Sequence, residues 1–232
     1  EKVRGIAVEA DADLGARMEA GRKQGKGDWL LFMEPGDILE PGAFYQICQK
    51  INRETKVKLI YSDSDKIDSE THTIFEPQFK PDDSPYTLQS GNYIGNSIWI
   101  HDKLAEEVGG IREGYGSQPL YDLILRCREK TDQISHISEI LYHESCPMER
   151  DLKGRQELCR KWDDGKRVLE SYYASAQIQA QVTWANYPLR YRVKWQVKGS
   201  PKVSVIIPNQ DHIADLEQCL RSIQKKTTYT NY

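Results

Sequence analysis

The sequence predicts an α/β fold, a three-layer α/β/α sandwich. Short apolar runs bounded by turn residues, such as Trp29–Met33 and Val57–Tyr61, have the length and composition of buried parallel strands. They alternate with segments whose apolar residues recur at helical spacing, which is typical of helices layered on a sheet. The length of 232 residues, 38% of them hydrophobic, allows one sizeable core and part of a second unit.

The beginning of the chain is predicted to run strand, helix, strand, helix. A short strand over Val3–Val8 precedes a helix over Leu14–Gln24, which is rich in helix formers and is followed by glycines. The strand Trp29–Met33 leads into a turn over Glu34–Asp37. The next helix opens at Pro41, because proline suits the first helical position and the following apolar residues lie at i, i+3, i+4 and i+7.

The middle of the chain is predicted to contain a long loop and then further strands and helices. Prolines and glycines recur over Pro77–Gly95, and loops of that length in compact domains are often functional. A strand over Ser97–Ile100 and a short helix over Lys103–Val108 follow. Another helix has apolar residues at helical spacing up to Cys127, and Ile134–Tyr142 is the last strand of this region.

The character of the sequence changes near residue 149. Residues 152–178 are charged and predicted to be helical, and Leu189–Val197 alternates apolar with polar residues, as a half-buried strand does. Val203–Ile207 reads as a buried strand, and the helix after it has an apolar face of Ile213, Leu216, Leu220 and Ile223.

These changes in sequence character divide the chain into three predicted parts. Residues 1–148 form a partial domain, residues 149–199 form a helical linker and an amphipathic strand, and residues 200–232 open a second domain.

Composition excludes several classes of function. The net charge is −3, from 32 basic and 35 acidic residues that are interspersed, so no basic stripe points to nucleic acid. The apolar runs are too short to span a membrane, and no signal peptide is visible in this segment. Five scattered cysteines without metal-ligand spacing favour a reducing, cytoplasmic setting. Other parts of the parent protein would bring it to the inner face of the membrane.

Five segments in order resemble the inverting family-2 glycosyltransferases of the GT-A fold, the nucleotide-diphospho-sugar transferase fold. The resemblance is to the branch found in bacterial surface-polysaccharide synthesis. It covers about residues 3–145 and rests on the segments Gly27–Asp37, Leu59–Asp68, Gln89–Gly95, Tyr115–Arg126 and Leu141–His143.

The tail resembles the first strand and helix of another such domain, and members of this branch often have two domains in tandem. The resemblance implies that the first domain is truncated at its N-terminus. A sheet without its central first strand exposes unpaired edges. We therefore expect Val203–Ile207 to insert where the missing strand belongs, either in the same chain or in a strand-swapped homo-oligomer.

The resemblance implies a divalent metal, Mg or Mn, held at the donor by an Asp-x-Asp turn. The matching turn contains Glu34 and Asp37, but Gly36 occupies the position of the metal-facing carboxylate. Asp37 is the candidate substitute ligand, and the alternative is that both acidic residues only close a turn. His143 matches a position near the metal in some relatives, with an ordinary surface role as its alternative.

Inverting transfer also requires a general base to deprotonate the acceptor hydroxyl. The resemblance places this base directly after Gln118, where the sequence has Pro119 and Leu120, and neither side chain accepts a proton. Glu113 on the preceding loop is a weak stand-in, and Asp122 matches a structural carboxylate. The catalytic base is therefore unknown, and the alternative for Pro119 is that it simply starts a helix.

The remaining candidates lie near the expected acceptor. Tyr93, Tyr115 and Gln118 mark the acceptor region, although the aromatic residues could equally belong to the core. Asp63 and Asp65 form a second acidic pair, for which we expect a solvated turn.

The predicted function is that of a fragment of a glycosyltransferase. In the parent protein its partners are a nucleotide-sugar donor and a glycan acceptor. The substituted metal carboxylate and base predict that this domain is weak or inactive, so that metal binding by the fragment is doubtful. The alternative is a non-catalytic scaffold or glycan-binding domain.

Overall fold

The computed structural model describes residues 5–147 and 152–232. It divides into two compact units, Glu1–Lys194 and Trp195–Tyr232, which are treated separately below. The predicted strand Val3–Val8 lies partly outside the described residues, and residues 5–8 form no strand.

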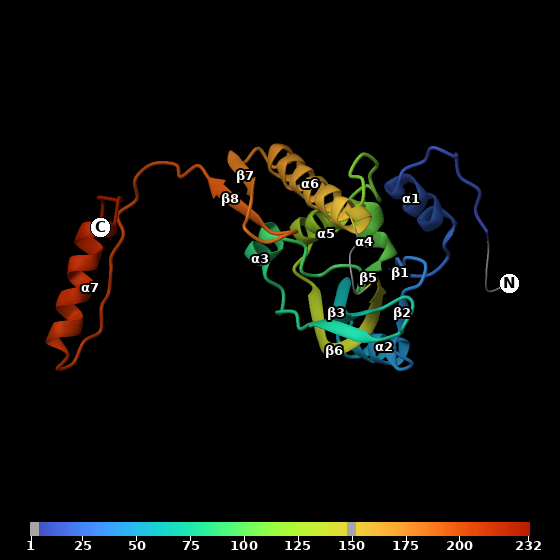
Figure 1. Ribbon diagram of the computed structural model, residues 1–232, viewed down its shortest axis with the longest axis horizontal. Coiled ribbons are helices and arrows are strands. Elements are labelled where there is room, and N and C mark those ends of the chain that lie inside the picture. Colours follow the sequence, from blue (N-terminus) through green and yellow to red (C-terminus); the bar gives the residue numbers. More distant parts are fainter. Residues whose placement is uncertain (1–4, 148–151) are drawn as a thin grey trace. The chain divides into compact units, whose positions relative to one another are not determined.

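A six-stranded mixed sheet forms the centre of the first unit (Figure 1). The strands run in the order β1-β5-β3-β6-β2, and β4 pairs with the far part of β3. β3 pairs in parallel with β6 and antiparallel with β5. The bounds are β1 (Trp29–Leu31), β2 (Ile38–Leu39), β3 (Leu59–Ile67), β4 (Ile74–Gln78), β5 (Ile98–His101) and β6 (Ile134–Ser145).

Helices cover both faces of this sheet, which gives the predicted three layers (Figure 1). The bounds are α1 (Leu14–Gln24), α2 (Ala43–Arg53), α3 (Pro85–Ser90), α4 (Asp102–Glu107), α5 (Pro119–Lys130) and α6 (Leu152–Ser175). On one face α2 buries Ala43 and Ile47 against Ile60 and Trp99. On the other face α5 is the central helix, and it packs with α4 and α6 over Leu59, Tyr61 and Ile100. The predicted α/β fold class is confirmed.

Local sequence signals explain where two of the helices begin. The carboxylate of Asp13 caps α1 by accepting a hydrogen bond from the amide of Ala16 at 2.8 Å. Pro119 occupies the first turn of α5, where its missing N–H costs nothing. The prediction that Pro119 starts a helix is confirmed.

Two local predictions were wrong. Residues 77–95 are not one long loop, because β4 ends at Gln78 and α3 occupies Pro85–Ser90. Asp63 and Asp65 do not lie in a solvated turn. β3 continues through them to Ile67, and both are buried. Histidines on the neighbouring strand β6 offset the cost of burying these carboxylates, and a sequence pattern does not reveal such cross-strand partners.

The segment from residue 152 to Lys194 is part of the first unit. α6 packs on α5, and Val168, Leu169 and Tyr173 lie in the main core. β7 (Ala180–Trp184), which the sequence did not reveal, pairs with β8 (Tyr191–Trp195). The compact unit ends at Lys194, whereas the predicted first domain ended at residue 148.

The second unit contains α7 (Ile213–Lys226) and an extended segment beside it. The amide of Val203 donates to the carbonyl of Asn231 at 2.9 Å, and the side chain of Asn231 donates to the carbonyl of Ser200 at 2.6 Å. Residues 203–207 form no strand and are not part of the six-stranded sheet, so the predicted insertion within the same chain was wrong. Within the second unit, Val203 at the start of this segment bonds to Asn231 after α7 instead of to a strand of the sheet.

Within the described ranges, no helix combines the length and the apolar character that a bilayer crossing requires.

Candidate functional site

A cleft of about 400 Å³ lies at the carboxyl ends of the sheet strands. β1, β3 and β6 run in the same direction, because β5 is antiparallel to both β1 and β3. Their ends bring Glu34, Lys66, Glu144 and Ser145 to the cleft. Ligands of open α/β sheets bind at this edge, so we call this space the main cleft.

Amide side chains and apolar surfaces make up much of the remaining lining. Gln78, Asn92, Asn96 and Gln118 contribute the amides. Leu14, Met18, Pro119, Leu120, Tyr121, Leu158, Leu189 and Tyr191 contribute the apolar or aromatic part. Amides hydrogen-bond hydroxyl groups without adding charge, and the apolar surfaces suit the C–H faces of a ligand.

The start of α5 and the adjoining face of α6 form one wall of the main cleft. Ser117, Gln118 and Pro119 come from the start of α5. Gly154, Glu157, Leu158 and Lys161 come from one face of α6, as their spacing of i, i+3, i+4 and i+7 requires. The sequence analysis assigned this helix to a linker and therefore missed its part of this wall. The only signal was the helical spacing of the four residues.

The carboxylate of Asp164 holds α6 against the start of α5. It accepts hydrogen bonds from the Ser117 amide at 2.9 Å and from the Ser117 hydroxyl at 3.0 Å. A Cβ atom on Gly116 would lie 2.2 Å from Asp164, and its φ of +57° also favours glycine. These contacts fix how α6 lies across the cleft.

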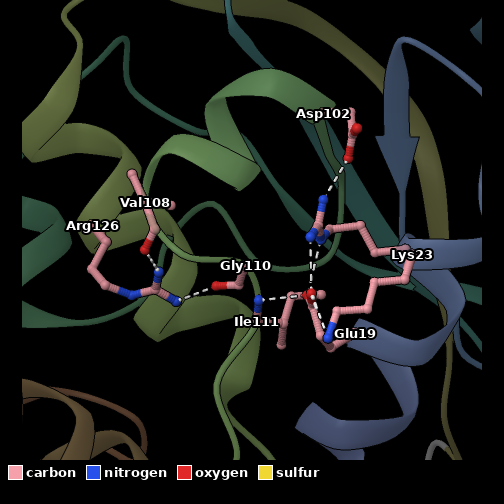
Figure 2. Close-up of polar contacts among 8 residues, drawn as sticks. Glu19, Lys23, Asp102, Val108, Gly110, Ile111 and Arg126 are labelled. Atoms are coloured by element: carbon pink, nitrogen blue, oxygen red, sulfur yellow. Dashed lines mark hydrogen bonds and ion pairs between the residues drawn. The ribbon is translucent and has the colours of Figure 1, made fainter.

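A polar clamp fixes the loop that leads to α5, as Figure 2 shows. The carboxylate of Glu19 accepts a hydrogen bond from the Ile111 amide at 2.8 Å and forms an ion pair with Arg22 at 2.9 Å. Burial alone would raise the pKa of Glu19, but these bonds hold that pKa below its ordinary value. From α5, Arg126 donates to the carbonyls of Val108 at 2.6 Å and Gly110 at 2.8 Å.

Asp37 lies in the predicted metal turn, and three donors occupy its carboxylate. The Ser145 amide and the Glu34 amide each donate at 2.9 Å, and the Tyr142 hydroxyl donates as well. Burial and the neighbouring carboxylate of Asp37 raise the pKa of Tyr142 above its ordinary value, so Tyr142 remains a donor. Asp37 thus joins the turn to the end of β6.

Gly36 is required by the conformation of the same turn. Its φ is +99°, a region that side chains rarely adopt. A Cβ atom there would lie 2.8 Å from the Ser145 hydroxyl. A carboxylate at this position would therefore strain the turn.

His143 is buried in β6 between two carboxylates. Its Nδ1 lies 2.5 Å from Asp65 Oδ1, and its Nε2 lies 3.4 Å from Glu40 Oε1. The described residues, 5–147 and 152–232, contain no group of three or more His, Cys, Asp or Glu arranged to hold a metal ion. The donor set around Asp37 and His143 is already used by hydrogen bonds within the protein, so these residues do not fit a metal site in this arrangement.

A second histidine with a largely covered side chain, His136, lies seven residues earlier in the same strand, β6. His136 Nε2 contacts Asp63 Oδ1 at 2.8 Å, and its ring stacks on Tyr61 with the centroids 4.8 Å apart. The same carboxylate accepts the amide of Lys80 at 2.9 Å. The Lys80 ammonium donates to the carbonyl of Ile94 at 2.7 Å, and burial lowers its pKa to about 7.

The three residues predicted for the acceptor region do not lie together. Gln118 lines the main cleft. Tyr93 is buried and accepts the amide of Ser84 at 3.0 Å, and the Tyr115 hydroxyl lies 2.8 Å from the Ser171 hydroxyl. Both tyrosines therefore pack in or against the core rather than along the cleft.

The predicted stand-in base and the structural carboxylate also lie apart from the cleft lining. Glu113 is exposed on its loop and does not line the cleft. Asp122 is buried in an ion pair with Arg126 at 2.6 Å, which is the structural role expected of it.

Comparison with known proteins shows relatives along the whole chain. The O-antigen biosynthesis protein RfbC of Myxococcus xanthus is 30% identical over 231 residues, which is 100% of this chain and 18% of that protein. An uncharacterised protein of Sinorhizobium fredii, y4gI, is 32% identical over 235 residues, again 100% of this chain and 26% of that protein. The chain thus spans about a fifth to a quarter of these relatives.

The resemblance to proteins of bacterial surface-polysaccharide synthesis is confirmed by the first of these matches. No protein-family profile matches the chain. Among solved structures, S. aureus TarS residues 1–349 has a TM-score of 0.46 and 12% identity, covering 70% of this chain and 53% of that one. A complex of the same fragment with UDP-GlcNAc also has a TM-score of 0.46, with 10% identity and coverage of 65% and 44%.

Proposed function

We propose that this chain is part of a family-2 glycosyltransferase of bacterial surface-polysaccharide synthesis, and that its own domain binds glycan but transfers sugar weakly or not at all. The parent protein would move a sugar from a nucleotide-sugar donor to a glycan acceptor in the cytoplasm. The observation that carries the proposal is the cleft at the strand ends, which has an amide-rich lining beside a metal turn whose carboxylate is already occupied.

The lining of the main cleft supports glycan as the ligand. Four amide side chains and the hydroxyl of Ser117 offer both donors and acceptors to sugar hydroxyls. The charged groups are three carboxylates and two lysines, and Lys66 is paired with Glu76. A neutral polyhydroxyl ligand suits this balance better than a diphosphate, which would need a surplus of cations.

Two substitutions support weak or absent transfer. Gly36 offers no metal-facing carboxylate, and Asp37 would have to give up three hydrogen bonds to serve instead. Pro119 occupies the place of the base. When bound in such a turn, Mg or Mn would supply positive charge to the leaving diphosphate. We propose that this turn does not hold that ion.

Isothermal titration calorimetry on the full 232-residue chain tests this function. The probes are maltotriose and chitotriose as neutral glycans, and UDP-glucose and UDP-N-acetylglucosamine with manganese or with EDTA. We expect glycan binding that EDTA leaves unchanged, and no manganese-dependent binding of the nucleotide sugars. Tight, manganese-dependent binding of a nucleotide sugar would contradict the proposal, and so would the absence of any glycan binding.

A further inference from the structure

Two carboxylates of α6 lie two helical turns apart on the same side of the helix. Glu157 precedes Asp164 by seven residues, which places it about 10 Å along the axis with nearly the same orientation. The hydrogen bonds between Asp164 and Ser117 fix that side of α6 against the start of α5. Glu157 and Pro119 accordingly line the same cleft.

The two carboxylates differ in how they are used. Asp164 accepts both Ser117 bonds and pairs with Arg167 at 3.2 Å, so its oxygens are occupied. Glu157 is exposed, and its carboxylate has no hydrogen bond or ion pair within residues 5–147 and 152–232. It also lines a second depression beside the main cleft, together with Ser117 and Lys161, so it stands at a rim that solvent reaches.

We propose that Glu157 is the residue that contacts the acceptor glycan, accepting a hydrogen bond from a sugar hydroxyl in the place that Pro119 leaves without a carboxylate. The ligand class is a neutral oligosaccharide, and the inference rests on the function proposed above. A carboxylate makes charge-assisted bonds to hydroxyl groups that are stronger than those of an amide. Lys161, one turn further along α6, lines the same wall.

Two other carboxylates line the main cleft, but neither lines the second depression. Glu34 belongs to the turn after β1, and Glu144 lies in β6. The residues that accompany Glu157 in both depressions are Ser117 and Lys161, which ties it to the α5 side of the cleft.

The test is titration of the full chain and its variants with maltotriose and chitotriose, by calorimetry and by ligand-observed NMR. Glu157→Gln keeps the size of the side chain and removes its charge. We expect its affinity for the glycan that binds to fall about tenfold. Asp163→Asn is the matched control, because it makes the same charge change at an exposed position on α6 outside both depressions, and its affinity should stay unchanged.

The outcomes separate the inference from the function beneath it. If the native chain binds glycan and Glu157→Gln binds equally well, the role of Glu157 is wrong while glycan binding stands. If Glu34→Gln loses affinity and Glu157→Gln does not, the acceptor contact lies at Glu34 instead. If the native chain binds no glycan, both proposals fail. Circular dichroism melts of each variant confirm that a lost affinity does not reflect lost folding.

Discussion

Glu157 lines the main cleft, whereas Asp37 lies behind its lining and accepts hydrogen bonds from two lining residues, Glu34 and Ser145. Asp37 lies in the turn that the sequence marked as the metal site, and it accepts three hydrogen bonds from Glu34, Tyr142 and Ser145. Glu157 lies in a helix that the sequence analysis treated as a linker, and it accepts none within the described residues. Asp37, which belongs to a recognisable motif, is used by hydrogen bonds within the protein. Glu157, which belongs to no motif, is available to a ligand.

These two residues illustrate two uses of a carboxylate. A carboxylate that accepts several hydrogen bonds within the protein contributes to stability, and removing it leaves those donors without that acceptor. A carboxylate at an open rim contributes little to stability and can bind a ligand at little cost. The four predictions below follow from this difference.

The largest effect is expected from Asp37→Ala. Three donors lose a charged acceptor, one of them the Tyr142 hydroxyl, so the free energy of unfolding should fall by about 3 kcal/mol. Urea denaturation without any metal measures it, with Asp163→Ala as the control. Unchanged stability would mean that Asp37 is a free ligand rather than a structural residue.

Gly36→Asp restores the carboxylate that the family motif would have. The substitution places a side chain at φ +99° and beside the Ser145 hydroxyl, so we expect a loss of about 2 kcal/mol in unfolding free energy and no gain of manganese affinity. Thermal melts and manganese calorimetry provide the two readouts. Manganese binding without loss of stability would show that the turn accepts a metal ligand after all.

Asp164→Ala tests whether α6 is held in place against α5. The Ser117 amide and hydroxyl lose their acceptor, which should cost about 1 kcal/mol and increase hydrogen exchange at the start of α5. Glycan affinity should fall with it, because Glu157 loses its fixed place. Retained affinity together with faster exchange would argue against the α6 wall.

The smallest effect on stability is expected from Lys80, a buried basic side chain, near neutral pH. Burial lowers its pKa to about 7 in the folded state, although Asp63 and Glu144 act in the opposite direction. The unfolded chain then binds more protons at Lys80 above that pH, so stability should rise as pH increases from 7 to 9. Urea titrations at these pH values measure the slope, and Lys80→Met should flatten it. A native slope of zero would contradict the pKa assignment.

The sequence predicted the layers of the fold better than it predicted the site. Helix-forming residues followed by glycines placed α1 at Leu14–Gln24, as the structure has it, because these signals are local in the sequence. The predicted strand ended at Tyr61, whereas β3 continues to Ile67. Asp63 and Asp65 look like solvated charges until their histidine partners on β6 are known. Partners that lie more than seventy residues apart in the chain leave no local pattern.

The site was only half predictable for a related reason. The order of the motifs predicted that Glu34 and Gln118 belong to the site, and the structure places both in the cleft lining. The motif could not show that Asp37 accepts three hydrogen bonds or that α6 lines the cleft, since both facts depend on tertiary contacts. Whether residues 200–232 open a second domain remains a prediction, because the second unit is compact but contains only one helix.

The most direct measurement is a paired titration of the native chain and Glu157→Gln with a neutral oligosaccharide in EDTA. We predict that the native chain binds without metal and that Glu157→Gln binds about tenfold more weakly. Equal affinity in the two proteins, or binding that appears only when manganese is added, would contradict it.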